Sequence, residues 1–416
     1  MVGRYGFKKL VKVDEAVKRL LSSFSVELPV EEVPLTEAYG RVSAVDLVSP
    51  INVPHFNRSA VDGYAVKAED TFGASPHSPR VLKVVDDPAK VLGSGFAYRI
   101  STGYPVPEPF DAVVMLEHSS ERNGNLEVYT PLTPMKNVSR EGEDVKKGEV
   151  IIRRGVIIEP HHVGLAAACG LTSIPVFRKP RALIVSTGEE VLKVGCELYN
   201  FKIYDSTSYI IYGLALSEGC KPEIYSKSPI SSSREELLEA LEYGLRHFDL
   251  VLFIGGSSVG SLDIVPRVLE ERGIKLFHGV AMKPGMPTAA FNVEGKPVVC
   301  LPGFPVAAFF SFITLVSPLI RSMYKLAEDL STPSFKAKLR RRLAGDLGKR
   351  VYVRVRVLRG EDGLEAEPIT ASGSGVISSL CKAQGYVVLK EDVDFVGEGE
   401  LVDVYLLGGL MRCLSW

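Results

Sequence analysis

A glycine-rich segment with two hydroxyl side chains is the first part of the sequence whose residue types suggest chemistry. It runs Gly255-Gly256-Ser257-Ser258-Val259-Gly260 and is followed by Asp263. Glycines let a backbone approach a bound group, and the free N–H groups of a helix beginning near Asp263 favour an anion. The segment predicts a phosphate site, with a plain strand-to-helix turn capped by Asp263 as the alternative. Neither the Walker lysine nor the dinucleotide glycine spacing is present.

Acidic and basic side chains elsewhere can complete such a site. Glu189 and Glu190, together with Asp263, can hold a hard cation such as Mg²⁺ through one or two carboxylates, unless they are solvent-facing loop acids. Lys283 stands in a segment that Pro284 and Pro287 stiffen, which suits a fixed cation for an oxyanion. By itself Lys283 would be an ordinary surface lysine.

A second set of candidates lies nearer the N-terminus. The run from 56 to 66 places Arg58, Ser59 and Asp62 among aromatic residues, although a β-turn at Asp62-Gly63 between two strands is the simpler interpretation. The segment Gly142-Glu143-Asp144 is a turn when taken alone. We interpret His161-His162 as a surface pair on the first turn of a helix, because adjacent helical residues point in different directions.

The elements that must position the first set lie between 181 and 324. Continuous apolar runs there predict buried parallel strands, and helical patterns alternate with them, so we expect a doubly wound parallel α/β domain. Ligands bind beyond the carboxyl ends of strands in such sheets. The loops that follow three of the strands should therefore open onto one edge. The predicted strands are Ala182–Val185, Leu250–Ile254 and Val298–Leu301, and the predicted helices are 205–218, 233–247, 263–272 and 305–323.

Three other regions have a different pattern. Residues 1–50 and 140–180 combine a helical start (7–24), strands at Val150–Ile152 and Val156–Ile158, and a helix between Pro160 and Gly170, which predicts an elongated domain. Residues 51–139 contain short strands such as Arg80–Val85 and Leu126–Tyr129 between turn residues, which predicts an inserted small β domain. Residues 325–416 predict a C-terminal β domain, open or barrel-like, with a strand at Tyr352–Val357 and a helix near 375–384.

Composition limits the classes of function. The 416 residues are 46% hydrophobic and 24% charged, with a net charge of −1, so no overall field attracts nucleic acid. The basic run Lys336 to Arg342 is interpreted as the solvated face of an edge strand. The six cysteines have no metal-finger spacing and fit a reducing cytoplasm. Residues 297–320 carry no charge, but Pro302, Gly303, Pro305 and Pro318 divide them, so we expect a strand, a turn and a core helix rather than a membrane span.

Taken in order, these segments resemble the molybdopterin molybdenumtransferase family (MoeA, and the E domain of gephyrin) over nearly the whole length. The family signature Phe-Asp-Asn-Ser-Ala-Met-Asp-Gly-Tyr-Ala matches Phe56 to Ala65. The remaining ordered matches are Thr102-Gly103, Asp111 to Val114, Gly142 to Asp144, Ser186 to Glu190, Tyr204-Asp205-Ser206, Gly255 to Asp263, Lys283-Pro284-Gly285 and Leu301-Pro302-Gly303.

The resemblance implies an enzyme that cleaves adenylylated molybdopterin, releases AMP and places molybdate or tungstate on the dithiolene with the help of Mg²⁺. It implies catalytic roles for Asp62, Asp144, Glu190, Asp263 and Lys283, of which Glu190 and Asp263 would hold the metal. It further implies a homodimer whose cleft joins the α/β domain of one subunit to the inserted domain of the other, with the molybdopterin adenylyltransferase as a possible partner. The substrate-binding residues would be Arg58, Ser59, Ser186, Thr187, Gly188, Gly255, Gly256, Ser257, Ser258, Gly260, Pro302 and Gly303.

Three departures from the family pattern keep other functions open. Met286 stands where the family has a second lysine, Arg58 adds a positive charge, and Phe304 with Ala307 replaces polar residues in the third loop. A catalytically weak scaffold that still binds the pterin is one alternative. A related nucleotide-handling enzyme, such as an adenylyltransferase or a pyrophosphatase, is the other, although it would share only residues 181–324.

Overall fold

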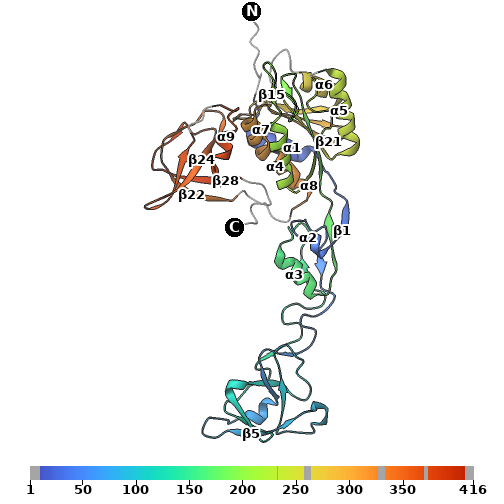
Figure 1. The fold of residues 1–416 in the computed structure, drawn as a ribbon, viewed down its shortest axis with the longest axis vertical. Coiled ribbons are helices and arrows are strands. Elements are labelled where there is room, and N and C mark those ends of the chain that lie inside the picture. The colour runs from blue at the N-terminus through green and yellow to red at the C-terminus, as the bar shows by residue number, and fades with distance from the viewer. Residues whose placement is uncertain (1–9, 232, 257–263, 327–332, 370–372, 408–416) are drawn as a thin grey trace, which may run out of the picture. The chain divides into compact units, whose positions relative to one another are not determined.

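The computed structural model describes residues 10–231, 233–256, 264–326, 333–369 and 373–407 (Figure 1). Two compact units divide the chain. The first comprises Met1–Glu31, Gly40–Val42 and Val176–Trp416, and the second comprises Glu32–Tyr39 and Ser43–Pro175. The domain limits at 51, 140, 181 and 325 stay predictions.

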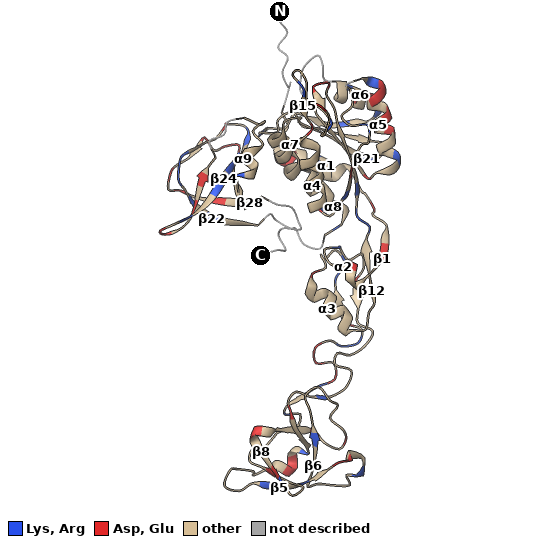
Figure 2. Ribbon diagram, viewed as in Figure 1, with Lys and Arg blue, Asp and Glu red and all other residues tan. Residues whose placement is uncertain are grey.

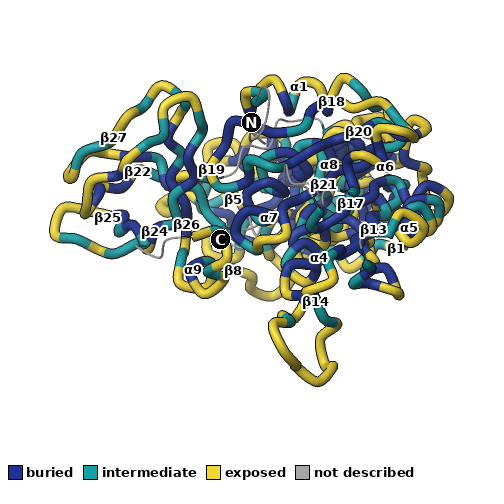
Figure 3. The backbone as a smooth tube through the Cα atoms, turned by 90° about the horizontal axis from the view of Figure 1, so that it is seen from above, coloured by how far each residue is buried: buried dark blue, intermediate teal, exposed yellow. Residues whose placement is uncertain are grey.

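A six-stranded sheet forms the centre of the first unit, in the order β16-β13-β17-β21-β20-β18. Its first four strands are parallel and contain the three predicted apolar runs, while the last two are antiparallel and extend the sheet. Dark blue segments in Figure 3 show how deeply this sheet is buried. The strands are β13 (Arg181–Ser186), β16 (Lys221–Ile224), β17 (Leu250–Ile254), β18 (Ile274–His278), β20 (Ala289–Val293) and β21 (Lys296–Leu301).

Helices cover both faces of this sheet, as doubly wound connections require (Figure 1). The helices α5 (Arg234–His247) and α6 (Ile264–Arg272) pack together against β17 and β20, whereas α4 (Thr207–Ser217) and α7 (Pro305–Ser311) pack together against β13 and β21. α1 (Val13–Ser23) is shorter than the predicted 7–24 and packs on the helix that follows α7.

The apolar helix after β21 corrects one prediction. Pro318 does not divide it, because α7 continues through a π-helical turn, η4 (Phe312–Val316), into α8 (Ser317–Met323). The wider turn explains how a proline, which lacks an N–H group, is accommodated here. Pro305–Met323 is long and apolar enough to cross a membrane, but 67% of its most apolar window is buried inside the protein. It is therefore a core helix, as predicted.

The C-terminal part of the first unit is a barrel. Its strands follow the order β24-β25-β22-β28-β26, and pairing of β24 with β26 closes the ring. A short strand, β19 (Met282–Lys283), joins β24 from outside. The predicted helix near 375–384 is only α9 (Ser378–Cys381). The barrel strands are β22 (Ser334–Leu339), β24 (Arg350–Gly360), β25 (Gly363–Pro368), β26 (Gly385–Leu389) and β28 (Leu401–Leu406), with a minor pair β23 (Leu343–Ala344) and β27 (Phe395–Val396).

Closure of the barrel corrects the interpretation of the basic run from 336 to 342. The strand β22 is not an edge, because it lies between β25 and β28. Acidic residues of the neighbouring chain segments pair with the run, and basic and acidic stretches lie beside one another on these strands in Figure 2. The ion pairs are Lys336–Asp403, Lys338–Asp362, Arg340–Glu365 and Arg341–Glu367.

The second unit contains a six-stranded sheet in the order β7-β4-β6-β5-β9-β8. Gly155 turns the chain before Val156–Ile158, which is no strand and is anchored by a hydrogen bond from the Ser43 N–H to the Val156 carbonyl. The helix α3 (Pro160–Ala168) begins and ends as predicted. The other strands and helices are β4 (Gly63–Val66), β5 (Arg80–Val85), β6 (Phe96–Ile100), β7 (Ala112–Met115), β8 (Ser119–Arg122), β9 (Asn125–Val128), β2 (Leu47–Val48), β3 (Arg58–Ser59), β10 (Val138–Ser139), β11 (Val150–Ile152), α2 (Leu35–Ala38), β1 (Val30–Pro34) and β12 (Ser173–Phe177).

Candidate functional site

Three strands of the α/β sheet end at the same level. Ser186 of β13 stands opposite Ile254 of β17, and Ile254 stands opposite Leu301 of β21. The pairing continues one step into the loops, because the Thr187 N–H donates to the Ile254 carbonyl at 2.9 Å and the Gly255 N–H donates to the Leu301 carbonyl at 3.0 Å. The three predicted loops therefore begin side by side at one edge of the sheet.

Glycines occupy the points where these loops meet. Gly255 has φ +89°, and a Cβ atom placed on it would lie 2.7 Å from the Thr187 carbonyl oxygen. A Cβ on Gly256, at φ +58°, would lie 2.8 Å from the Val265 side chain. Only glycine fits both the backbone angle and the space. The other candidates of this loop, Ser257, Ser258, Gly260 and Asp263, lie outside the described residues.

The loop after β13 presents two exposed acids, Glu189 and Glu190. Ser186 and Thr187 are buried, and the Thr187 hydroxyl donates to the Ile254 carbonyl at 3.2 Å, so this side chain holds two loops together. Gly188 has φ +132°, and the Glu190 carboxylate oxygens lie 2.7 and 2.9 Å from where its Cβ would be. The absence of a side chain at Gly188 thus allows the exposed Glu190 to fold back over the loop.

A small parallel pair of strands fixes this acidic loop. β14 (Val191–Leu192) pairs with β15 (Ile203–Tyr204), and the Ile203 N–H donates to the Glu190 carbonyl at 2.9 Å. The Lys202 ammonium donates to the Glu189 carbonyl. These contacts fix the backbone around Glu190 against β15, which lies just before α4 in the sequence.

Two positioning residues were missed among the predicted site residues. Asp205 is buried and accepts the Ser208 N–H at 3.0 Å, so it caps the first turn of α4. The Thr207 hydroxyl donates to the Gly303 carbonyl at 2.9 Å and so ties the third loop to α4. The sequence contained a signal for them, because the motif Tyr204-Asp205-Ser206 stands directly before a helical pattern.

The third loop and Lys283 differ in their surroundings. Pro302 is buried, whereas Gly303 and Phe304 are exposed, and the Phe304 ring lies 3.4 Å from where a Cβ on Gly375 would be. Lys283 keeps 63% of its side chain exposed and forms an ion pair with Asp346 at 3.2 Å. Hydrogen bonds from Lys349 and Lys283 lower the pKa of the Asp346 carboxyl below its usual range.

The second unit gathers its own candidates around β3 and β4. The Thr102 N–H donates to Asp62 Oδ1 at 2.9 Å, and the Ser59 N–H donates to the Tyr104 carbonyl at 2.8 Å. Arg58 and Asp62 are exposed, while Ser59 is buried and its hydroxyl donates to the Val61 carbonyl at 2.6 Å. Thus Arg58 and Asp62 are available to a ligand, whereas the Ser59 hydroxyl already serves the turn.

The segment with Asp144 lies next to the same strand. Ser139 pairs with Arg58 in the register of β10 and β3, and the Ser139 hydroxyl donates to Glu143. The hydrogen bonds from Ser139 and from the Arg140 N–H, together with the charge of Arg58, lower the pKa of Glu143. Asp144 is exposed, and its N–H donates to the Val53 carbonyl at 3.1 Å. The structure therefore brings two of the predicted motifs together.

Metal-ligating side chains do not gather in the part of the chain that the structure describes, where no group of three or more His, Cys, Asp or Glu could hold an ion. The His162 ring accepts the Glu159 N–H at 3.0 Å and closes a capping box at the start of α3. His162 therefore has a structural role, and His161 lies exposed beside the same Glu159 at 3.4 Å. Glu190 is the described member of the predicted Mg²⁺ pair.

Family models match three consecutive parts of the chain. The MoeA N-terminal region (domain I and II) matches residues 11–170, a probable molybdopterin binding domain matches residues 183–322, and the MoeA C-terminal region (domain IV) matches residues 336–407. Together they cover almost the entire described chain.

Relatives match over their full lengths. A putative molybdopterin biosynthesis protein of Methanocaldococcus jannaschii is 38% identical, with 96% of this chain and 99% of that protein covered. The molybdopterin molybdenumtransferase of Haemophilus influenzae is 32% identical, with 96% and 100% covered. Among solved structures, the molybdopterin biosynthesis MoeA protein of Pyrococcus horikoshii OT3 superimposes with a TM-score of 0.83 at 32% identity, with 96% of this chain and all of that chain covered.

Proposed function

The chain belongs to the MoeA family of molybdopterin molybdenumtransferases, and from this premise we propose that it inserts molybdate or tungstate into adenylylated molybdopterin with release of AMP. As a member of the family it is a transferase of molybdenum cofactor biosynthesis. The observation that carries the proposal is the meeting of three loops at one edge of the sheet, where Gly255 lies against the Thr187 carbonyl.

The proposed role of each residue follows from whether its side chain and backbone are exposed or buried. The glycine-rich segment after β17 and the exposed backbone at Gly303 would bind the phosphates of the substrate. Glu190 would face them with its carboxylate, and Lys283 would balance the charge of the oxyanion. Asp62, Asp144 and Arg58 would contribute charged groups from the second unit. Of the remaining proposed residues, Ser186, Thr187 and Ser59 would position these groups, because they are buried.

Magnesium fits the described residues in chemistry. Mg²⁺ is bound in proteins by one or two carboxylates together with substrate phosphates and water, and Glu190 offers one exposed carboxylate above Gly188. When bound, the ion would neutralise the phosphates at the bond that breaks. We propose Asp263 as its second ligand. Release of AMP should therefore require Mg²⁺, which titration with a chelator would test.

The proposal also concerns the oligomeric state of the protein and its location in the cell. We propose a homodimer in the cytoplasm that receives adenylylated molybdopterin from a molybdopterin adenylyltransferase. Both subunits would then contribute to each of the two sites, with the Asp62 and Glu190 of one site on different chains. Dimers are the commonest closed assemblies of soluble proteins, and a shared site would make dimerisation necessary for activity.

The test is a reaction with the full-length protein. Purified protein is incubated with adenylylated molybdopterin and Mg²⁺, with molybdate, with tungstate or with neither, and both AMP and the metal in the pterin product are measured. We expect AMP release that depends on one of the oxyanions. Binding of the pterin without AMP release in the presence of either oxyanion would instead establish the weak scaffold. Release of pyrophosphate in a parallel reaction with ATP and molybdopterin would point to the related nucleotide enzymes.

A further inference from the structure

Two lysines share a single carboxylate beside β19. Lys283 Nζ lies 3.2 Å from Asp346 Oδ2, and Lys349 Nζ lies 3.1 Å from the same oxygen. Lys349 also approaches Asp346 Oδ1 at 3.3 Å. Because both distances end on one atom, the two ammonium groups cannot be farther apart than the sum of these distances. The cluster carries two positive charges and one negative charge.

Backbone hydrogen bonds hold the three side chains in this arrangement. β19 pairs in parallel with β24, so that Met282 stands opposite Arg350 and Lys283 opposite Val351. The turn before β24 is closed by the Lys349 N–H, which donates to the Asp346 carbonyl at 2.8 Å. Gly348 supports this turn with φ +84° and donates to the Glu391 carbonyl at 2.8 Å. The two lysines therefore approach the carboxylate from separate, fixed backbone segments.

A second charged group borders this cluster. Arg350, next to Lys349 in the sequence, pairs with two carboxylates, Asp14 and Glu391, so these three side chains carry one net negative charge. On the barrel, by contrast, basic residues pair one to one with acids, as Lys336 does with Asp403. Lys283 is 63% exposed and Lys349 is 31% exposed, so an anion in solution can reach both ammonium groups. The cluster is a small, accessible site of net positive charge.

We propose that Lys349 is a second oxyanion-binding residue, which receives a tetrahedral dianion such as molybdate or tungstate together with Lys283, while Asp346 positions both lysines. The inference rests on the proposed function, because that function assigns the oxyanion to Lys283. A tetrahedral dianion has several acceptor oxygens, and charge-assisted hydrogen bonds of about 2.7–2.9 Å allow two of them to bind ammonium groups at this separation. Two cations from different segments also select a doubly charged ligand over a singly charged one.

The test measures tungstate binding by isothermal titration calorimetry on the full-length protein, without pterin. The variants are Lys349→Met, Lys283→Met and, as a matched control, Lys336→Met, which removes a lysine that is as exposed as Lys283 and also pairs with an aspartate. We expect Lys349→Met and Lys283→Met each to raise the Kd for tungstate at least about tenfold, because each removes one hydrogen bond to a charged ligand. Lys336→Met should bind like the unchanged protein.

Kinetics separate this inference from the proposed function. If Lys349 binds the oxyanion, Lys349→Met raises the KM for tungstate or molybdate while AMP release at saturating oxyanion is retained. Tungstate affinity and KM that stay unchanged in Lys349→Met would overturn the inference while AMP release by the unchanged protein still upheld the function. Absence of tungstate binding by the unchanged protein would overturn it as well.

Discussion

At Gly255, the absence of a side chain allows two loops of the candidate site to lie against each other. Gly255 has a φ of +89°, and a Cβ atom at this position would lie 2.7 Å from the Thr187 carbonyl oxygen. Only glycine is compatible with both the backbone angle and this close contact. Gly255→Ala should push the two loops apart and reduce AMP release about a hundredfold, since small displacements of bound groups have effects of that size. The steady-state rate of AMP release by Gly255→Ala measures this loss.

Gly195 provides the matched control for Gly255. It has φ +95°, but no atom lies within 4 Å of the place where its Cβ would be. Gly195→Ala therefore carries the same backbone strain without the contact. Gly195→Ala should lose less thermal stability than Gly255→Ala, and only Gly255→Ala should lose activity. Equal activity in the two would show that the contact with Thr187 has no role in the site.

Asp62 allows charge and hydrogen bonding to be separated. Asp62 Oδ1 accepts the Thr102 N–H at 2.9 Å, and asparagine retains such an oxygen while losing the charge. We expect Asp62→Asn to melt at the temperature of the unchanged protein and to release AMP about a hundredfold more slowly, the size found when charge stabilisation is removed from an active site.

Asp70 serves as the control for that substitution. Asp70 Oδ2 accepts the Gly95 N–H at 2.7 Å in the same unit, and no predicted motif includes it. Asp70→Asn should leave AMP release unchanged. A similar loss in both variants would mean that the second unit responds to any change of charge, which would remove Asp62 from the mechanism.

Residue types identified single candidates in the sequence, but not the partners that decide their roles. Asp346 is 63 residues from Lys283 and has no recognisable motif, so the ion pair could not be predicted. Thr187 was predicted as a ligand, and its hydroxyl in fact bridges β13 and β17. Glycine positions were more predictable, because a turn between a strand and a helix restricts the residue type directly.

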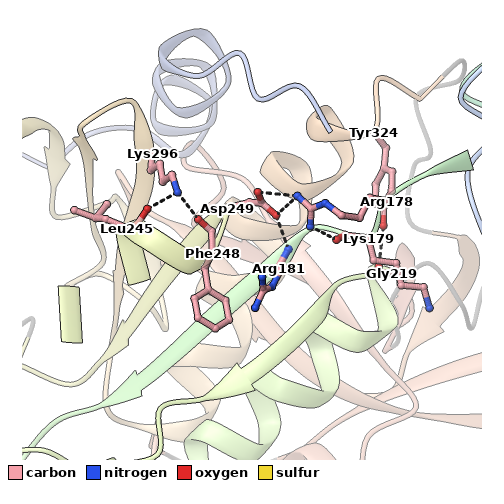
Figure 4. A network of polar contacts seen from close by, with 9 residues as sticks. All are labelled: Arg178, Lys179, Arg181, Gly219, Leu245, Phe248, Asp249, Lys296 and Tyr324. Atoms are coloured by element: carbon pink, nitrogen blue, oxygen red, sulfur yellow. Dashed lines mark hydrogen bonds and ion pairs between the residues drawn. The ribbon is translucent and has the colours of Figure 1, made fainter. Parts of the chain in front are cut away.

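At the scale of elements, one aspartate anchors the sheet end opposite the site (Figure 4). Asp249 precedes β17, accepts both contacts of Arg178 Nη2 at 2.9 Å and accepts the Arg181 N–H at the start of β13 at 2.7 Å. About a quarter of each side chain is exposed. We expect Asp249→Ala to lower the free energy of unfolding by about 1.5–3 kcal/mol, as for hydrogen bonds to charged groups, with solvent screening favouring the lower end.

Urea unfolding followed by circular dichroism measures this change. Glu239→Ala is the control, because it removes an ion pair with Lys227 in which both side chains are more than half exposed. Surface pairs of that kind contribute little, so the control should unfold at the same urea concentration as the unchanged protein. An Asp249→Ala midpoint equal to that of Glu239→Ala would contradict the proposed anchoring of β13 and β17.

Strands that are apolar throughout were predictable because burial on both faces leaves no polar alternation. β17 was predicted at its observed limits, and α5 differs by one residue at its start. The π-helical turn was not predictable, because Pro318 normally ends a helix and only packing of the surrounding core stabilises the wider turn. Barrel closure depends on pairing β24 with β26, residues far apart in sequence, and local patterns carry no signal for it.

For the whole molecule, changes between helical and alternating patterns separated an α/β region from β regions in the sequence. The limits of these regions stay predictions, and the family models match residues 11–170, 183–322 and 336–407. Contacts within the chain instead unite the α/β region with the barrel in one compact unit, for example through the pairing of β19 with β24. Such contacts depend on tertiary packing, which local periodicity does not report.

The proposed sharing of one site between two subunits leads to the last prediction. Asp62→Asn and Glu190→Gln would each alone reduce AMP release about a hundredfold. If Asp62 and Glu190 of one site come from different chains, a mixed dimer of the two variants has one unaltered site and one doubly altered site. Refolding the variants together in equal amounts should then restore about a quarter of the activity, because half of randomly formed dimers are mixed and each has one intact site.

Mixing Glu190→Gln with Lys283→Met, both altered in the first unit, should restore none. Absence of recovery in the first mixture, with mixed dimers verified by mass spectrometry, would place the complete site within a single chain.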